Sequence, residues 1–360
     1  MNVAFTYNVK HTTPSKNLSA QSEAEFDSPE TIEAIKKALE NAGHTVFPIE
    51  ADENAYSKFL SLKAKITIVF NIAEGIRGES RESHIPAILE ILDIPYTHSG
   101  ILAQSITLDK ALTKKVLSFH GIKTPKFFLV RRNDQLREID SIDLSFPLIV
   151  KPNAEGSSKG IFSENLAYDK VKLAERIRWL LSKFREHVLV EEFLRGREFT
   201  VSMLGNPPKI LPIVEQNYAI FPENMPHFAS YEAKWLFEDS LPNPHEAYFC
   251  PPDIDTSLQN KIEDICFKTW EALELKDVCR IDLRFDNLEN PSILEVNTLP
   301  GLIPDPNVVA YFPIAARKAG YSYEGMVNSI LDAALLRYGL KKPKPVYQHI
   351  PKPLTLGKPK

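Results

Sequence analysis

Residues 278–297 read VCRIDLRFDNLENPSILEVN, and this stretch decides the fold more than any other part of the chain. Apolar and polar residues alternate along 278–285, which predicts a β-strand with one buried face. Arg280 and Asp282 then share the opposite face. The turn-forming residues DNLENP follow, and they predict that the chain reverses into a second strand.

The second strand carries two more polar side chains, Glu295 and Asn297, which are expected to point outward while Leu294 and Val296 point inward. If the strands pair as a hairpin, two carboxylates and one amide meet beside Arg280 on one sheet face. Hard oxygen ligands of this kind suit Mg²⁺, and an arginine suits a phosphate or a developing oxyanion. A solvated face with salt bridges is the other interpretation of the pattern.

Length and composition narrow the class of protein. The 360 residues suit two or three packed subdomains. A net charge of −4 gives no reason to expect nucleic acid or a membrane as a partner. Three cysteines without a Cys-x-x-Cys pair argue against a disulfide framework or a zinc site. The start lacks a secretory signal and no apolar run reaches roughly 18 residues, so a cytoplasmic protein is expected.

Strand and helix patterns alternate over residues 1–105, which predicts an open α/β layer as the N-terminal domain. Its strands are expected at 3–7, from Val46 onward and at 65–72, and its helices at 29–42 and 87–92. The first helix has Ser28 as its cap and Pro29 at its first position.

Two further units are expected, a central one over 106–197 and a C-terminal one over 198–338. The central unit has strands at 126–130, 147–151 and 188–193 and helices at 110–119 and 169–184, the second with Val171, Ala174, Ile177, Leu181 and Phe184 toward its core. The C-terminal unit pairs 199–204 with 210–214 and has helices at 256–273 and 323–337. Residues 216–248 show little periodicity and are interpreted as a lid, a surface connection being the alternative. The Lys- and Pro-rich tail, 339–360, is expected to be disordered or draped on the surface.

Two other segments carry chemistry. The stretch PLIVKPNAEGSSKG at 147–160 brings Lys151 to the end of an apolar strand and continues into a Gly/Ser loop, whose backbone N–H groups can approach phosphate oxygens. The stretch VLVEEFLRGREFT at 188–200 can offer backbone groups to an adenine edge, with Glu198 near ribose hydroxyls. Taken alone, the first is equally typical of an ordinary glycine hairpin, and the second is better explained as a charged linker.

In their order and spacing these segments resemble the ATP-grasp fold and, over residues 1 to about 338, the D-alanine–D-alanine ligase family. The matching motifs are PYTHSG at 95–100, DK at 109–110, VKPxxEGSSxG at 150–160, LVExFLxGxEFT at 189–200, YEAK at 231–234, RxD at 280–282 and ExNTxPG at 295–301. The resemblance implies a mixed α/β fold of three subdomains, with ATP between the central and C-terminal ones.

The resemblance also implies an activity, the ATP- and Mg²⁺-dependent, ADP-forming ligation of amino-acid substrates. A substrate carboxylate would attack the γ-phosphate of ATP, and an amine would attack the acyl phosphate. Two Mg²⁺ ions, with Mn²⁺ as an alternative, would be held by Asp282, Glu295 and Asn297. A homodimer is expected, with no nucleic-acid or membrane partner.

The matching motifs assign the family's site residues to positions in this sequence. The catalytic group would be Arg280, Ser157, Lys234 and Glu25, the last holding the substrate amine with Glu23 as the other candidate. Phosphates and the nucleotide would be bound by Lys110, Lys151, Glu155, Ser158, Glu191, Phe193, Leu194 and Glu198. Substrate would also contact Trp235, Gly301, Pro306 and Asn307.

Several positions depart from the family pattern. Trp235 stands where the family usually has a tyrosine that pairs with the serine, and simple counting puts Pro306 and Asn307 where a serine-leucine pair grips a carboxylate. Residues 71–79 replace the family's early histidine-glycine segment. These changes touch substrate pockets and spare ATP binding, so a different amino-acid ligase is favoured, such as one that attaches an amino acid to a mycosporine core. Authentic D-alanine–D-alanine synthesis is an alternative, and a non-catalytic ATP-binding module is a remote one.

Overall fold

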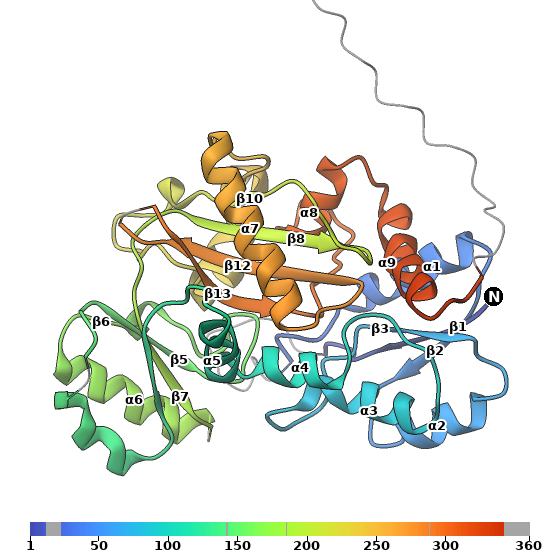
Figure 1. Cartoon of the computed structure of the whole chain (residues 1–360), viewed down its shortest axis with the longest axis horizontal. Helices are drawn as coiled ribbons and strands as arrows, with labels where there is room; N and C mark the ends of the chain where they lie inside the picture. The colour runs from blue at the N-terminus through green and yellow to red at the C-terminus, as the bar shows by residue number, and fades with distance from the viewer. Residues whose placement is uncertain (12–22, 142, 185, 288, 342–360) are drawn as a thin grey trace, which may run out of the picture.

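The computed structural model describes residues 1–11, 23–141, 143–184, 186–287 and 289–341 (Figure 1). Most of the predicted tail, from residue 342 onward, therefore lies outside the described residues. Within the described part, no helix is both long enough and apolar enough to cross a membrane. Helices and strands are mixed throughout, as the sequence predicts.

The N-terminal part contains a parallel sheet in the order β2-β1-β3, which confirms the predicted open α/β layer. Its elements are β1 (Asn2–Tyr7), α1 (Pro29–Asn41), β2 (Thr45–Glu50), α2 (Ala55–Leu62), β3 (Ile68–Asn71) and α3 (His84–Ile91). The predicted cap is confirmed, because the Ser28 hydroxyl accepts a hydrogen bond from the Thr31 N–H at 3.3 Å. Helix α3 begins before Pro86, since a proline in the first turn removes no helical hydrogen bond.

The middle of the chain forms an antiparallel sheet in the order β4-β7-β5-β6, preceded by two helices. The elements are α4 (Ile101–Leu108), α5 (Lys110–Phe119), β4 (Phe127–Val130), β5 (Leu148–Pro152), β6 (Leu166–Ala167), α6 (Lys170–Phe184) and β7 (Val188–Glu192). The prediction that Val171 faces the core of α6 is wrong, because this residue is 80% exposed. The predicted burial of Ile177 is confirmed, and the helix buries Leu173 and Leu180 beside it, because its apolar stripe faces β5 and β7.

The third sheet runs β11-β10-β8-β12-β13, with β9 beside β8. Its strands are β8 (Glu198–Leu204), β9 (Lys209–Ile210), β10 (Val214–Gln216), β11 (Tyr248–Phe249), β12 (Val278–Phe285) and β13 (Pro291–Asn297), and the helices are α7 (Thr256–Ala272), α8 (Tyr311–Lys318) and α9 (Tyr323–Arg337). Helix α7 lies across the inner face of β12 and β13 (Figure 1). Between β10 and β11, residues 217–247 form short helical turns joined by irregular segments, among them a π-turn at Ala233–Phe237.

The β12–β13 hairpin is antiparallel, as predicted, and its register places Arg280 opposite Asn297 and Asp282 opposite Glu295. The next pair is Leu283 with Ile293, so Leu294 is an extra residue in a β-bulge. The expectation that Leu294 points inward is therefore wrong. Ile293 is fully buried in its place, and Leu294 lines a cavity on the outer face.

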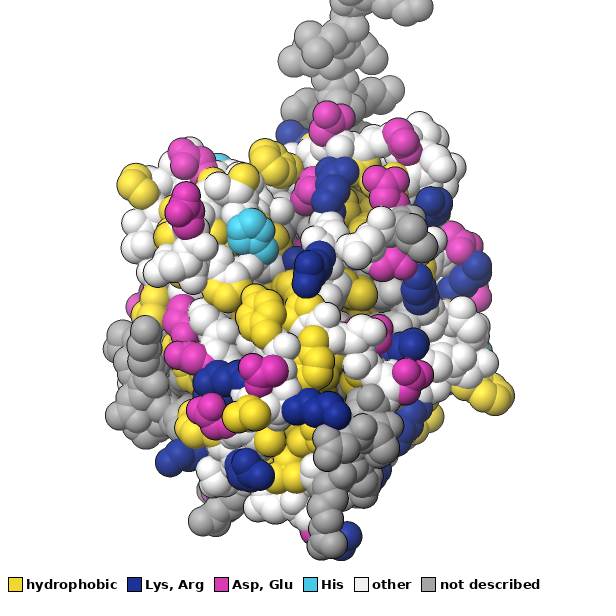
Figure 2. Space-filling model, turned by 90° about the vertical axis from the view of Figure 1, so that its left-hand side faces the viewer, with side chains coloured by type: hydrophobic (Ala, Val, Ile, Leu, Met, Phe, Trp, Pro, Cys, Tyr) yellow, Lys and Arg dark blue, Asp and Glu magenta, His cyan; other side chains and the backbone are white. Residues whose placement is uncertain are grey.

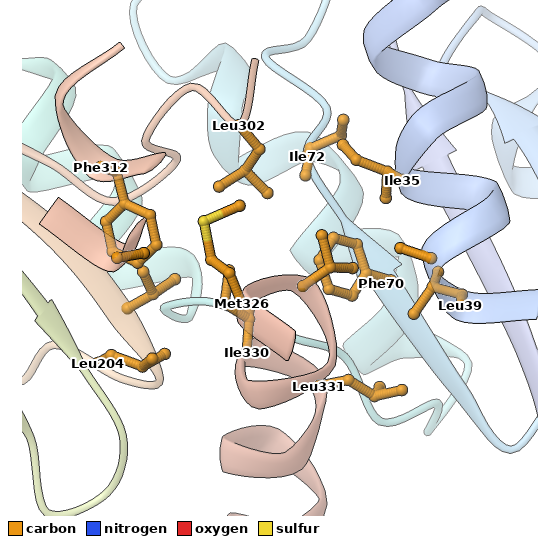
Figure 3. Packing of buried hydrophobic residues seen from close by; sticks show 14 of the residues in the cluster. Ile35, Leu39, Phe70, Ile72, Leu204, Leu302, Phe312, Met326, Ile330 and Leu331 are labelled. Carbon is orange, nitrogen blue, oxygen red and sulfur yellow. The ribbon is translucent and has the colours of Figure 1, made fainter. Parts of the chain in front are cut away.

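One hydrophobic cluster joins the two ends of the chain. Ile35 and Leu39 of α1 and Phe70 of β3 pack against Met326 and Ile330 of α9 (Figure 3). This packing fixes the N-terminal layer beside the third sheet and places the loop before α1 opposite the outer face of β12 and β13.

Candidate active site

Two adjoining cavities, of about 320 and about 120 Å³, lie between the three sheets. Their walls share Gly156, Ser157, Lys234, Arg280 and Glu295, so the groups on the outer face of β12 and β13 stand where the cavities meet. On the molecular face shown in Figure 2, acidic and basic side chains are interspersed around a strip of apolar ones. The larger cavity is likewise lined by charged side chains of both signs, among them Lys110, Arg280 and Glu295.

The predicted convergence of four polar groups on β12 and β13 is confirmed. The Arg280 Nη2 lies 2.8 Å from the Asp282 Oδ2, and 4.0 Å from a Glu295 oxygen. The Asn297 amide donates to the Asp282 Oδ2 at 3.1 Å, and the Thr200 hydroxyl donates to the Asp282 Oδ1 at 2.8 Å. Two carboxylates and an amide thus meet beside one guanidinium.

This donor set fits Mg²⁺. Among the described residues, no group of three or more His, Cys, Asp and Glu side chains could hold a metal ion. Mg²⁺ needs only one or two carboxylates when phosphate and water complete its shell. Burial opposes ionisation of Glu295, but the cationic groups of Lys110, Lys151, Arg280 and Lys234 outweigh burial and hold its pKa at about 2. Glu295 is therefore ionised at neutral pH, as a metal ligand must be.

Lys110 and Lys151 bring positive charge to the same place. The Lys110 Nζ donates to the Glu155 carbonyl oxygen at 2.6 Å and lies 3.4 Å from a Glu295 oxygen. The Glu155 carboxylate faces Lys159 at 2.8 Å. All of these residues lie around the 153–160 loop, which supports the predicted phosphate-binding location.

The Glu191 side chain, expected at adenine, is fully buried between two lysines. Its oxygens lie 2.7 Å from the Lys114 Nζ and 2.6 Å from the Lys151 Nζ. The Lys114 Nζ also donates to the Leu294 carbonyl oxygen of the bulge at 2.7 Å. The sequence analysis missed Lys114. Its position four residues after Lys110 places both on one helical face, a spacing that signals a shared role.

The smaller cavity has apolar walls and a polar end. Ile149, Phe193, Leu194, Phe228 and Leu294 are among its lining residues. Apolar side chains of this kind can cover a purine ring, which supports the expected positions of Phe193 and Leu194.

Glu198 binds two residues that the sequence analysis did not assign to the site, Arg284, which also lines the smaller cavity, and Tyr218. Its Oε2 lies 3.0 Å from the Arg284 Nη1 and accepts a hydrogen bond from the Tyr218 hydroxyl at 2.8 Å. Burial raises the pKa of Glu198 although Arg284 opposes the shift. The Arg284 guanidinium also lies over the Phe193 ring, 4.6 Å from its centroid.

The lid meets the phosphate loop through a backbone oxygen. The Trp235 indole N–H donates to the Ser157 carbonyl oxygen at 3.0 Å, which replaces the side-chain coupling of a serine and a tyrosine. The Ser158 hydroxyl, expected at phosphate, donates to the Ala229 carbonyl oxygen at 2.8 Å and ties the loop to the lid. Burial, assisted by Arg280, lowers the pKa of Lys234 to about 8, so this lysine is cationic at neutral pH.

Glu25 is the N-terminal acidic residue that reaches the cavity, but it is already paired. Its oxygens lie 2.8 and 2.7 Å from the Arg81 Nη2, and one accepts the Gly156 N–H at 2.6 Å. A Cβ atom at Gly156 would lie 2.4 Å from that oxygen, so a larger residue would displace the Glu25 carboxylate from this position. Glu23 instead accepts the His11 N–H at 2.6 Å and does not line the cavity. The sequence analysis missed Arg81, because the pair joins residues far apart in the chain.

Three further carboxylates, Asp27, Glu74 and Glu82, line the same side of the larger cavity. Burial raises the pKa of Asp27 to about 7. Burial also raises the pKa of Glu74 well above its usual value, assisted by Glu82, Glu25 and Asp27. The pKa of Glu82 rises to about 8, mainly through burial and then through Glu25. The carboxylates therefore lie close enough to repel one another.

The raised pKa of Asp27 predicts a pH-dependent stability. The folded state retains this proton up to about pH 7, while the unfolded state loses it near pH 4, so the contribution to stability falls as the pH rises through that window. Asp27→Asn is therefore expected to raise the free energy of unfolding of the ligand-free protein by about 1–3 kcal/mol at pH 7.5, and by much less at pH 4.5. Urea denaturation at both pH values measures this. Equal effects of the substitution at both values would contradict it.

The structure does not bring Pro306 and Asn307, which motif counting placed at the substrate, to the cavity wall. Both residues are exposed and neither lines the cavity. The Asn307 N–H and side chain both bind the Asp305 carboxylate, which turns this segment outward. Gly301 lines the cavity as expected, and the wall continues with Ile303 and residues 308–311. Counting from Gly301 misses this outward turn, which the sequence DPN signals.

Comparison with known proteins agrees with this geometry. A family model described as D-ala D-ala ligase C-terminus matches residues 116–332. The D-alanine–D-alanine ligase of Carboxydothermus hydrogenoformans is 36% identical over 312 residues, which cover 85% of this chain and 92% of that protein. An uncharacterized protein of Sinorhizobium fredii, y4sG, is 34% identical over 313 residues, covering 85% and 88%.

Solved structures show the same fold. The D-alanine–D-alanine ligase of Bacillus anthracis, solved in complex with ATP, superposes with a TM-score of 0.68 at 22% identity, over 94% of this chain and 99% of that one. The VanG D-Ala:D-Ser ligase of Enterococcus faecalis gives a TM-score of 0.69 at 19% identity, over 92% and 99%. The fold of this chain is therefore the fold of these ligases.

Proposed function

Since the chain belongs to the D-alanine–D-alanine ligase family, whose members are ATP-dependent, ADP-forming ligases with the ATP-grasp fold, we propose that it joins an amino-acid carboxylate to an amine through an acyl phosphate, with at least one substrate other than D-alanine. The observation that carries the reaction is the meeting of Arg280, Asp282, Glu295 and Asn297 where the two cavities join. The substrate part of the proposal rests on the changed residues around the larger cavity.

In this proposal the smaller cavity binds the nucleotide, between the sheet that contains β5 and β7 and the sheet that contains β12 and β13. Phe193 and Leu194 cover adenine, and Glu198 meets ribose. Lys110 and Lys151 neutralise phosphate oxygens. Two Mg²⁺ ions would be held by Asp282, Glu295 and Asn297, and bound Mg²⁺ supplies charge neutralisation at the transferred phosphate.

The proposed reaction has two steps, phosphoryl transfer to the carboxylate and attack of the amine on the acyl phosphate. A substrate carboxylate oxygen forms a bond to the γ-phosphorus as the bond to the β-phosphate oxygen breaks, which releases ADP. An amine nitrogen next forms the C–N bond, the C–O bond to phosphate breaks, and the amine proton leaves to solvent or phosphate. Arg280 stabilises the tetrahedral oxyanion that exists after the C–N bond forms and before the C–O bond breaks. The closed lid excludes water from the acyl phosphate.

The activity is tested with a carboxylate substrate labelled with ¹⁸O. ADP release that depends on Mg²⁺, with transfer of ¹⁸O to inorganic phosphate, is the expected result. ADP release without label transfer would exclude the acyl phosphate. Efficient conversion of D-alanine alone into its dipeptide would instead support the second candidate, an authentic D-alanine–D-alanine ligase, which is favoured by relatives of that name at 31–36% identity.

A homodimer belongs to the same proposal, and sedimentation equilibrium measures it.

The lid contact gives a separate prediction. Trp235→Phe removes the donor to the Ser157 carbonyl oxygen, so a less firmly closed lid is expected to raise the ratio of ADP to ligated product about 2- to 10-fold, the effect of one hydrogen bond. Ser157→Ala retains the carbonyl oxygen and serves as the matched control. The ratio is measured by coupled assay and mass spectrometry. Equal uncoupling by both substitutions would contradict a contact through the backbone.

A further inference from the structure

Three segments from different parts of the chain meet at the wall of the larger cavity, and each contacts the other two. They are the N-terminal loop (residues 8–11 and 23–27), the 153–160 loop and the lid. Glu25 of the N-terminal loop accepts the Gly156 N–H at 2.6 Å, and the Ser157 carbonyl oxygen accepts the indole N–H of Trp235 in the lid at 3.0 Å. The third contact joins the lid to the N-terminal loop, because the Lys10 Nζ lies 4.7 Å from the centroid of the Trp235 ring.

The position of Lys10 is fixed by its own loop. The Lys10 N–H donates to the Asp27 carbonyl oxygen at 2.8 Å, and the Asp27 N–H donates to the Asn8 carbonyl oxygen at 3.1 Å. The Lys10 Nζ donates to the Ala24 carbonyl oxygen at 3.2 Å. These hydrogen bonds lie within the N-terminal loop and do not involve the lid. They therefore place the ammonium group at the cavity wall independently of the position of the lid.

The Trp235 side chain can make two contacts in different directions. Its N–H lies in the plane of the indole ring and donates to the Ser157 carbonyl oxygen, while Lys10 lies over the ring. Among aromatic rings, the indole ring binds cations best. The Nζ of the neighbouring Lys234 lies 5.2 Å from the same ring centroid, so the indole ring also lies beside the lysine assigned to the phosphates.

Contacts of this kind decide how firmly the lid is closed. The lid consists of short helical turns, so regular secondary structure does little to hold it in one position. A contact between a cation and an aromatic ring shifts an equilibrium about 3- to 30-fold, the larger value applying where water is excluded. Lys10 and Trp235 are both half-buried, so their contact lies within that range.

We propose that Lys10 is a positioning residue that holds the lid closed over the larger cavity through the face of the Trp235 ring, and thereby keeps Lys234 in place. The inference deepens the proposed function and rests on it, because closure of the lid protects the acyl phosphate from water. It also gives a physical reason for tryptophan at position 235, since the indole group binds the 153–160 loop with its edge and the N-terminal loop with its face.

Hydrogen exchange of the full chain, followed by mass spectrometry, tests the contact without reference to catalysis. Lys10→Met keeps a long apolar side chain and removes the ammonium group, so the amides of residues 228–240 are expected to exchange about 3- to 30-fold faster. Lys10→Arg is expected to restore slow exchange, because a guanidinium group also binds an aromatic face. Lys63→Met, which changes an exposed lysine of the N-terminal layer, is the control and should behave as wild type. Exchange of the lid at the wild-type rate in Lys10→Met would overturn the proposal.

A double-variant cycle separates an effect through the ring from an effect on the N-terminal loop alone. Trp235→Leu removes the ring, so Lys10→Met is expected to cause no further increase in lid exchange when the two substitutions are combined. If Lys10→Met accelerates exchange by the same factor with and without the ring, Lys10 does not act through Trp235 and the assignment is overturned.

The consequence for the reaction is measured separately. Lys10 lines the larger cavity and not the smaller one, so Lys10→Met is expected to leave the KM for ATP unchanged. The ratio of ADP to ligated product is expected to rise about 3- to 30-fold, and Lys10→Arg should reverse this rise. A wild-type ratio in Lys10→Met would overturn the role of the contact in the reaction. If no amino-acid pair releases ADP but lid exchange depends on Lys10 and Trp235 together, the proposed function fails and the assignment of the contact stands.

Discussion

Asp282→Asn is expected to lower Mg²⁺-dependent ADP release by at least about 10³-fold, because it removes one of the two carboxylates that face the phosphate end of the cavities. The substitution keeps the size of the side chain and an oxygen that can accept the Thr200 hydroxyl. Its effect therefore falls on the bound cation and on Arg280, which loses its closest carboxylate.

Steady-state ADP release as a function of Mg²⁺ concentration measures this effect. The matched control is Asp264→Asn on α7, whose carboxylate is 61% exposed and, among the described residues, pairs with Lys268 alone, so wild-type activity is expected. The melting temperature separates loss of metal binding from loss of folding. Wild-type ADP release by a folded Asp282→Asn protein would refute the metal assignment.

Lys114→Met is expected to destabilise the protein by about 3–5 kcal/mol, because it leaves the Glu191 carboxylate buried with Lys151 as its remaining partner. Both Lys114 and Glu191 side chains are only 1% exposed, so water cannot replace the missing ammonium. The substitution also removes the donor to the Leu294 carbonyl oxygen, beside the metal-facing Glu295. Weaker Mg²⁺ activation is therefore expected together with lower stability.

Urea denaturation of the single variants Lys114→Met and Glu191→Gln, and of the double variant, measures the coupling energy. Lys115→Met is the control, since Lys115 is the next residue of α5 and is exposed. A loss of stability from Lys114→Met no larger than that from Lys115→Met would show that the buried pair contributes little. Recovery of stability in the double variant would identify the unpaired carboxylate as the cause of the loss.

Local pattern predicted most of the fold and one face of the site. The alternation along 278–285 predicted β12 and the meeting of Arg280 with Asp282, because a strand's two faces follow directly from a period of two. The bulge at Leu294 was not predictable, since it depends on how β13 pairs with β12. The exposed Val171 shows the same limit, because the direction of a helix's buried stripe is fixed by the sheet it packs on.

The features of the site that local pattern did not predict depend on pairs of residues that are far apart in the sequence. Arg81 and Glu25 are 56 positions apart, and no local pattern shows that one neutralises the other. The commitment of Glu191 to Lys114 depends likewise on the packing of α5 against β7 and β13. The outward turn that displaces Pro306 and Asn307 was signalled by DPN, but its effect on the cavity wall required the position of α8.

The packing of α1 against α9 has a consequence for how the chain is made. The Asn328 amide donates to the Ala38 carbonyl oxygen across 290 positions, and the N-terminal layer shares its hydrophobic cluster with the last helix. During synthesis, that layer emerges from the ribosome long before α9 exists, with the part of α1 that packs on α9 still uncovered. It can complete its core only when translation is nearly finished, so part of its apolar surface stays exposed until the final helix docks.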